Sequence, residues 1–456
     1  MKFKTLSYFL ALCMVISIGS CANSAETADT NGGIIYGGVG DKAAEGTFAG
    51  ESYEGVDYAP SVEIGEAAAA PSDDYFEEGE FFESVSDSVS DRGGAEGDIA
   101  VEGDYSESYV DSDYVVTEQY IQPQAGLLTG GEWNDNKNFD FWTNLITDRY
   151  DWEYINHHWN FDTRNRIAVT VNENGTPVQN VDIKLISGNT VMWEAVTDNS
   201  GNAYLFKDFI YGNHQYTPTK IIAEYKGKTI AEMEYADGDS VELNVTSPQK
   251  QKTALDLMFV IDTTGSMSDE LRYIQTELND IVKRVAKNNQ IDVRLSVNFY
   301  RDTQDEYTVR SYPFTENLSE AVNAINMQEA NGGGDYEEAV EKALDDAVNN
   351  HDWNEDNIKL MFLVLDAPPH YSAKSELPQI LYDAAAEGIR IIPVASSGVD
   401  TETEYLCRTF AIATGGTYTF LTDHSGVGGS HLEPTVGYYQ VEKLNDMIVR
   451  IIESYL

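Results

Sequence analysis

The chain of 456 residues carries 77 acidic and 29 basic side chains, which gives a formal net charge of −48 at pH 7. This excess of acid argues against binding to nucleic acid or docking on anionic lipid, because both need a basic protein face. An apolar fraction of 42% is enough for hydrophobic cores, and the length predicts two or three domains in a soluble protein that could meet cations or basic partners.

The first 21 residues have the pattern of a targeting segment. Lys2 and Lys4 precede an apolar run, Phe9–Ile18, that is too short to span a membrane. Ile18-Gly-Ser-Cys21 resembles the lipobox of bacterial lipoproteins, which implies that Cys21 carries acyl chains and begins the mature protein. An ordinary signal peptide with an incidental cysteine is the alternative.

The lipobox resemblance implies a place in the cell. We expect a lipid-anchored protein of the bacterial cell envelope, periplasmic or surface-exposed. Ala22, rather than aspartate, follows the cysteine and favours the outer membrane.

Residues 22–125 are expected to form a disordered acidic tether. They are rich in Gly, Ser, Ala, Glu and Asp and show no sustained strand or helix period. High charge and low apolar content cannot offset the chain entropy lost on folding. The tyrosines spread along this stretch are an alternative signal, for short binding segments.

Residues 126–164 hold four of the six tryptophans. Aromatic side chains at this density should bury area. The phrase Gly130-Gly-Glu-Trp-Asn-Asp-Asn136 resembles a segment found upstream of the metal-binding domain in some bacterial von Willebrand A proteins. We expect a brace packed on a neighbouring domain, with a sugar-stacking aromatic platform as the alternative.

Residues 165–247 predict an all-β sandwich domain. About seven short runs of β-forming residues alternate with turn signals such as Asn172-Glu-Asn-Gly175. Gly175-Thr-Pro-Val178 and Thr197-Asp-Asn-Ser-Gly201 resemble the transthyretin-like or carboxypeptidase-regulatory-like domains of bacterial surface proteins. Such modules act as spacers or binding surfaces, and nothing here looks catalytic.

Residues 254–456 predict an α/β domain with a doubly wound, mostly parallel, six-stranded sheet. The segment alternates buried apolar runs with amphipathic patterns and contains six expected helices. The expected strands are Ala254–Ile261, Ile291–Tyr300, Tyr307–Phe314, Ile358–Leu365, Ile389–Ala395 and Thr417–Leu421.

Polar residues gather where these strands end. In such sheets the loops at the carboxyl ends of the strands share one crevice. The oxygen-bearing residues placed there are Asp262, Thr264, Ser266, Asp302, Asp335 and Asp366. Carboxylates and hydroxyls without Cys or His among them suit a hard cation, Mg²⁺ before Ca²⁺.

At this point the sequence resembles a known family. Asp262-x-Thr264-x-Ser266 is similar to the D-x-S/T-x-S motif of the von Willebrand factor A domain, the metal-ion-dependent adhesion site, and Asp366 matches the family's second aspartate. The resemblance covers residues 254–456 and implies that the two hydroxyls bind Mg²⁺ directly and the aspartates mostly through water. One coordination position is then left for a carboxylate supplied by a partner.

The loop Asn331–Ala339 departs from the family pattern, which supplies a threonine here. Asp335 is the available oxygen ligand. Its alternative role is the N-cap of the following helix, with Glu338 closing a capping box, and we expect both roles. Direct binding by Asp335 would weaken the attraction of the metal for a partner's carboxylate.

Three further residues are expected to rim the site: Arg301, Asp302 and His370. They belong to Phe299-Tyr-Arg-Asp302 and Asp366-Ala-Pro-Pro-His370, which resemble a bacterial subset of these domains. The alternatives are a structural salt bridge and a solvated loop. His424 and His431 lack a third ligand at zinc spacing, so a second metal there is the weaker interpretation.

These features predict a binding protein rather than an enzyme. We expect it to hold a protein or glycan partner through a Mg²⁺-bridged carboxylate, with Mn²⁺ or Ca²⁺ as substitutes. The alternative is a metal-dependent hydrolase that uses Asp302 or His370 as a base. No Ser-His or Cys-His pairing, P-loop or two-metal carboxylate cluster in the sequence supports that alternative.

Overall fold

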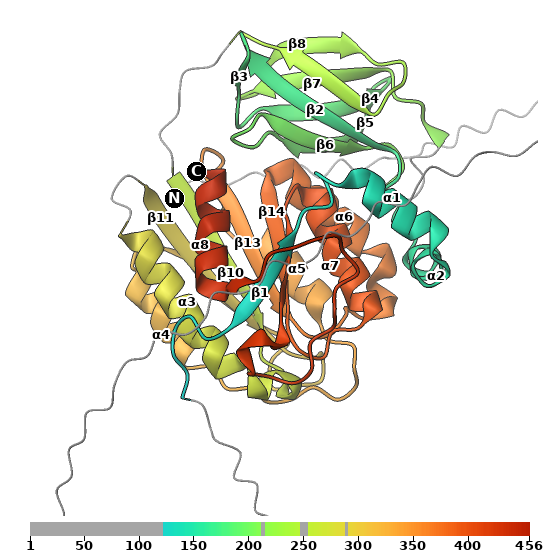
Figure 1. Cartoon of the computed structure of the whole chain (residues 1–456). Helices are drawn as coiled ribbons and strands as arrows, with labels where there is room; N and C mark the ends of the chain where they lie inside the picture. The colour runs from blue at the N-terminus through green and yellow to red at the C-terminus, as the bar shows by residue number, and fades with distance from the viewer. Residues whose placement is uncertain (1–121, 211–214, 247–253, 288–290) are drawn as a thin grey trace, which may run out of the picture. The chain divides into compact units, whose positions relative to one another are not determined.

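The computed structural model describes residues 122–456, apart from 211–214, 247–253 and 288–290 (Figure 1). The expected lipobox at Cys21 and residues 22–121 of the expected tether lie outside the described residues. Among the helices of the described part, none is long and apolar enough to cross a membrane.

An eight-stranded sheet holds the candidate site at the end of one of its interior strands, β10. Its order is β12-β11-β10-β13-β14-β15-β1-β16. The four pairings β10–β11, β10–β13, β13–β14 and β14–β15 are parallel, and the rest are antiparallel. The strands are β1 (Thr129–Trp133), β10 (Ala254–Asp262), β11 (Asp292–Tyr300), β12 (Val309–Thr315), β13 (Ile358–Leu365), β14 (Ile389–Ala395), β15 (Tyr418–Leu421) and β16 (Glu442–Lys443).

Helices cover both faces of this sheet (Figure 1). Alternate side chains of β10 enter two different cores: Leu257 and Phe259 join one, and Met258 and Val260 the other. The first core includes side chains of α3 (Leu271–Ala286), α4 (Leu318–Asn326) and α8 (Leu444–Tyr455). The second includes those of α5 (Val340–Asn349), α6 (Leu377–Glu387) and α7 (Thr401–Thr414). Burial on both sides explains the continuous apolar run of β10.

The sheet has eight strands rather than the six predicted from residues 254–456. The main addition is β1, which pairs with β15 from Gly130↔Leu421 to Trp133↔Tyr418. A Cβ on Gly130 would lie 2.7 Å from the Phe420 carbonyl oxygen, and one on Gly131 would lie 2.5 Å from the Phe420 ring. The two glycines therefore allow a close approach, but glycine is depleted in strands, so the sequence alone gave no strand signal here.

Two four-stranded sheets follow β1, with the orders β3-β2-β6, where β9 also pairs with β2, and β5-β4-β7-β8. Buried side chains from both sheets, such as Ile167 and Leu185, belong to one hydrophobic cluster. All seven expected runs contain a strand. The strands are β2 (Arg166–Glu173), β3 (Thr176–Pro177), β4 (Asp182–Ser187), β5 (Thr190–Val196), β6 (Asn202–Phe206), β7 (Lys220–Tyr225), β8 (Lys228–Glu234) and β9 (Ser240–Asn244).

The aromatic segment also contributes two helices, α1 (Phe139–Asp148) and α2 (Tyr150–Trp159). Trp142 and Trp152 are fully buried and contact Tyr405 of α7 at ring-centroid distances of 5.6 and 6.2 Å. These rings pack as core, because their faces are covered by other rings and leave no surface for a bound sugar.

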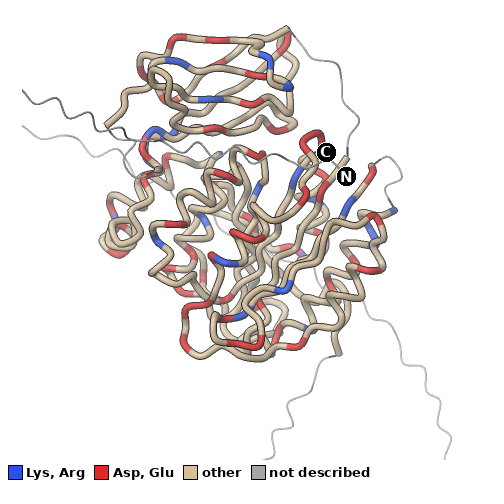
Figure 2. Tube along the Cα trace, turned by 180° about the vertical axis from the view of Figure 1, so that it is seen from behind, with Lys and Arg blue, Asp and Glu red and all other residues tan. Residues whose placement is uncertain are grey.

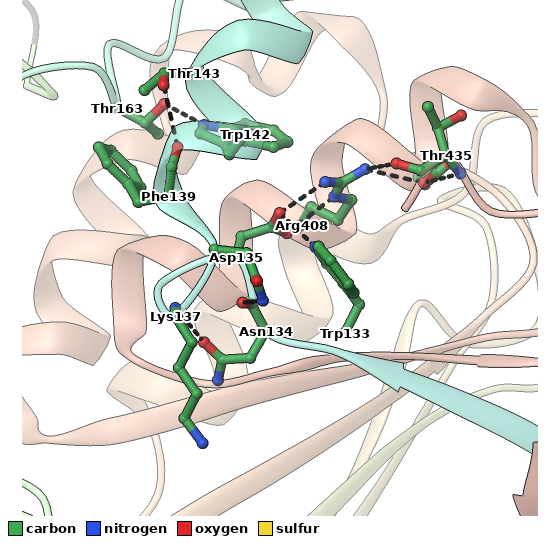
Figure 3. Close-up of polar contacts among 12 residues, drawn as sticks. Trp133, Asn134, Asp135, Lys137, Phe139, Trp142, Thr143, Thr163, Arg408 and Thr435 are labelled. Carbon is green, nitrogen blue, oxygen red and sulfur yellow. Dashed lines mark hydrogen bonds and ion pairs between the residues drawn. The ribbon is translucent and has the colours of Figure 1, made fainter. Parts of the chain in front are cut away.

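A buried ion pair fastens this segment to α7 (Figure 3). Arg408 donates through Nε and Nη2 to the two carboxylate oxygens of Asp135, at 2.9 and 2.7 Å. Its Nη1 donates to Glu404 at 3.2 Å and to the Thr435 carbonyl at 2.6 Å. The side chains of Arg408 and Asp135 are 0% and 1% exposed. The phrase around Asp135 is therefore an anchor point for the strand β1 that precedes it.

Candidate metal centre

Acidic positions are spread along the helices and loops of the described chain, and basic ones are fewer (Figure 2). Surface charge alone therefore does not locate a site. Burial does, because a carboxylate inside a protein is costly unless it is paired or binds a metal.

Asp262 ends the interior strand β10 and is completely buried. Its Oδ1 accepts hydrogen bonds from the backbone N–H and the hydroxyl of Thr264, at 2.8 and 2.7 Å. The Thr264 hydroxyl lies 3.1 Å from that of Ser266, at the start of the 3-10 helix η2 (Gly265–Asp269). The other oxygen of Asp262, Oδ2, is buried and has no hydrogen-bond partner among the described residues.

Asp366 directly follows β13, the parallel neighbour of β10. It is 3% exposed. Burial raises the pKa of Asp366 to about 6, and a hydrogen bond from the Ser266 hydroxyl opposes that rise. Within the part of the chain that the structure describes, its Oδ1 also lacks a partner. The structure thus brings together Asp262, Thr264, Ser266 and Asp366, as the strand order predicts.

Glu338 is a third buried carboxylate, although the sequence pattern predicts for it only a role in a helix cap. It is 3% exposed, and a Cβ on Gly333 would lie 2.8 Å from its Oε1 and 3.6 Å from the Thr264 Cβ. Burial, followed by the charges of Asp262, Asp302 and Asp366, raises the pKa of Glu338 to about 9. Its Oε2 is buried and finds no hydrogen-bond partner in residues 122–456 where these are described.

The donor set fits a divalent cation. Asp262, Glu338 and Asp366 each have one buried oxygen without a partner among the described residues, and two hydroxyls lie beside them. Burial and the Asp366 charge raise the pKa of Asp262 to about 7. A cation bound between these carboxylates would stabilise their charged forms and so oppose all three shifts, and carboxylate and hydroxyl oxygens suit a hard ion.

These raised pKa values predict how stability depends on pH in EDTA. The three groups keep their protons to about pH 6, 7 and 9 in the native state, against 3.8 for Asp and 4.5 for Glu otherwise. The native chain then binds more protons than the unfolded chain, so the free energy of unfolding should fall as pH rises from about 4 to 9.

Glu338→Gln isolates the highest of these titrations. Melting temperatures of the two chains between pH 7 and 9 should show a shallower fall for the variant, because glutamine has no proton to lose in this range. Equal slopes would contradict the assignment of the raised pKa to Glu338.

The predicted capping role of Asp335 is wrong. Helix α5 begins at Val340 with Ala339 as its N-cap. The Glu338 backbone N–H instead donates to the Pro368 carbonyl at 3.0 Å, and residues 338 and 369 form a β-bridge. This bridge holds the chain extended, so the helix cannot start at residue 335. Asp335 is exposed and lies with Asp302 and His370, where one ligand atom from each falls within 4.8 Å of the others.

The three expected rim residues have different surroundings. Arg301 is 6% exposed and donates to the carbonyls of Thr263 and Glu329 at 3.1 and 2.8 Å, so it holds the loops together. His370 Nε2 lies 3.1 Å from Asp302 Oδ1. Asp302 and His370 therefore contact each other, while Arg301 is committed to the backbone.

His431 is engaged in a separate cluster. Its two ring nitrogens lie 2.7 Å from Glu270 Oε1 and 2.7 Å from Asp423 Oδ1. These two carboxylates raise the pKa of His431 against the effect of burial. The imidazole thus links Glu270, directly after η2, to Asp423, the first residue of η4 (Asp423–Ser425).

Comparison with known proteins decides what the large sheet is. Residues 256–427 match the family model of the von Willebrand factor A domain. This part of the chain is a von Willebrand factor A domain. The match spans β10 to the loop after β15, so the A domain includes Asp262, Glu338 and Asp366.

Two further similarities are weaker. Over 127 residues the chain is 28% identical to an ariadne-like RING finger protein of Acanthamoeba polyphaga mimivirus. This aligned region covers 27% of this chain and 12% of that protein. The conserved hypothetical protein BatB from Bacteroides thetaiotaomicron aligns with a TM-score of 0.30 and 12% identity, over 44% of this chain and 98% of BatB. At this coverage and identity, neither similarity assigns an activity.

Proposed function

We propose that this chain is a cell-envelope lipoprotein whose A domain binds a carboxylate-bearing protein or glycan through Mg²⁺ at Asp262, Thr264, Ser266, Glu338 and Asp366. The observation that carries the proposal is the set of three buried carboxylates, each with an oxygen that has no partner among the described residues. A von Willebrand factor A domain at residues 256–427 supports it, because such domains often bind divalent metal and mediate protein interactions.

Each residue of the proposed site has a different role. Asp262 holds the Thr264 hydroxyl by a 2.7 Å hydrogen bond, which fixes where this neutral ligand points. Ser266 lies 3.1 Å from Thr264 and supplies a second hydroxyl. Mg²⁺ bound there would supply a positive centre with room for one outside carboxylate. We assign Glu338 rather than Asp335 to this site, because Glu338 is buried beside Asp262 and Asp366 whereas Asp335 is exposed.

Binding experiments with matched serine variants test the proposal. The full-length chain should retain an envelope partner in Mg²⁺ and release it in EDTA. Ser266→Ala should lose the partner, while Ser268→Ala, the same change at an exposed hydroxyl two residues on, should keep it. Retention that ignores both EDTA and Ser266→Ala would refute a metal-bridged contact. Substrate turnover that needs Mg²⁺ would instead favour the hydrolase alternative.

The lipid anchor is tested by one substitution. If Cys21 carries the acyl chains, Cys21→Ala should convert a detergent-phase protein into a soluble or uncleaved one, because each buried methylene contributes about 0.8 kcal/mol to membrane binding. Phase partitioning measures this, and Cys407→Ala, at a buried cysteine of α7, is the control. A Cys21→Ala chain that is processed normally and still partitions with membranes would contradict the anchor.

A further inference from the structure

We propose that Asp302, Asp335 and His370 form a second cation site on the A domain, suited to a transition-metal ion such as Zn²⁺ rather than to Mg²⁺. One ligand atom from each residue lies within 4.8 Å of the others. The residues come from three loops: after β11, after α4 and after β13. An imidazole together with two carboxylates is a ligand set that Zn²⁺ accepts, whereas Mg²⁺ prefers oxygen alone.

A second, independent observation is the carboxylate behind the histidine. Glu341 Oε1 lies 3.3 Å from His370 Nδ1, and the Glu341 side chain is 4% exposed. Its Oε2 is buried and unpartnered within the described residues. Metal-bound histidines commonly donate their second N–H to a carboxylate, which fixes the ring and leaves the other nitrogen free to bind. Glu341 would hold His370 in this way, with Nε2 directed at Asp302.

The geometry needs one small movement, and the chain allows it. Ligands about 2.0–2.2 Å from a tetrahedral Zn²⁺ lie roughly 3.4 Å apart, closer than the 4.8 Å limit of the cluster. His370 Nε2 and Asp302 Oδ1, at 3.1 Å, are already close enough. Asp335 is exposed, so a change of its side-chain rotamer can bring its carboxylate nearer to the other two ligands.

The site is reachable from solvent. A surface pocket opens beside the imidazole, and Asp335 lies exposed on the cluster. The pocket is lined by Thr303, Glu341, Lys342, His370, Ser372 and Glu376, among others, and Lys342 is paired with Glu376 at 3.1 Å. An ion could therefore reach the imidazole of His370 from the surface, and three protein ligands would leave a fourth position for water.

The competing explanation is a His370 that only hydrogen-bonds to Asp302 and Glu341 and binds no metal. Nitrogen-15 NMR of the seven histidines of the full-length chain separates the two. With Mg²⁺ saturating, added Zn²⁺ should move the Nε2 chemical shift of one histidine to the value of a metal-bound nitrogen. His370→Asn should remove that signal and abolish tight binding of Zn²⁺. His424→Asn, at an exposed histidine, should change neither.

Two further variants keep the proposal falsifiable if His370→Asn fails to fold. Glu341→Gln should weaken Zn²⁺ roughly 10- to 100-fold, because it loses the charge behind the imidazole. Asp262→Asn should leave Zn²⁺ binding intact while it removes the Mg²⁺ response. A histidine spectrum that ignores Zn²⁺, Zn²⁺ affinity unchanged in Glu341→Gln, or Zn²⁺ binding lost in Asp262→Asn would each overturn a separate second site.

Discussion

Millimolar Mg²⁺ is expected to raise the melting temperature of the EDTA-treated full-length chain. An ion that binds only the native state stabilises it by about 2.7 kcal/mol at a hundredfold excess over Kd. For a domain of about 200 residues this is a rise of roughly 5–10 °C. The physical reason is local: Asp262, Glu338 and Asp366 are buried, and burial, followed by nearby acidic side chains, raises the pKa of each.

Substitutions at the site distinguish the effect of removing a repelling charge from the effect of removing a metal ligand. Asp262→Asn keeps a hydrogen-bond acceptor for Thr264 but removes a repelling charge, so it should abolish the rise while leaving the metal-free melting temperature unchanged or higher. Thr264→Ala should weaken the response without that compensation. Glu355→Gln, at an exposed carboxylate, should respond like the wild type. A response of equal size in Asp262→Asn and Glu355→Gln would place the ion elsewhere.

Arg408→Met is expected to cost about 3–5 kcal/mol of stability, because it leaves buried carboxylates without their counter-charge. Arg408 is fully buried and binds Asp135 through two hydrogen bonds of 2.9 and 2.7 Å. Glu404, also buried, would lose the same partner at 3.2 Å. The melting temperature should fall by roughly 6–20 °C, and protease should cut first near β1, which Asp135 anchors.

Arg450→Met is the matched control. Arg450 binds Glu132 of β1 at 2.8 Å and Glu442 at 2.7 Å, so it also ties β1 to its neighbours. Its side chain is 46% exposed, and exposed ion pairs contribute less than about 1 kcal/mol. If the two substitutions lowered the melting temperature equally, Asp135 and Arg408 would not be the anchor of the N-terminal segment.

The accuracy of the fold prediction follows the strength of the apolar pattern. Strands β13 and β14 have the bounds predicted for them, because apolar residues fill most of both segments. Strand β1 was not predicted, because two of its five residues are glycine. Its place in the sheet depends on contacts with Phe420, about 290 residues away, which no local pattern reveals.

Some residues of the site could likewise be predicted from the sequence, and others could not. The positions of Asp262, Thr264 and Asp366 follow from strand ends that must meet at one edge of a parallel sheet. The position of Glu338 does not follow from the strand ends, because the sequence pattern around Asp335 equally favoured a helix cap. The deciding contact is the bridge between residues 338 and 369, a pairing of two loops that are remote in sequence.

Calorimetric titration of Mg²⁺ into the full-length chain tests the central claim most directly. Because burial and neighbouring charges raise the pKa of Glu338 to about 9, Mg²⁺ binding near pH 7 must release a proton from it. The apparent binding heat should therefore differ between buffers of different ionisation heat, and this difference should shrink in Glu338→Gln. A wild-type chain that binds no Mg²⁺, or binds it with the same proton release as Glu338→Gln, would contradict the proposed metal centre.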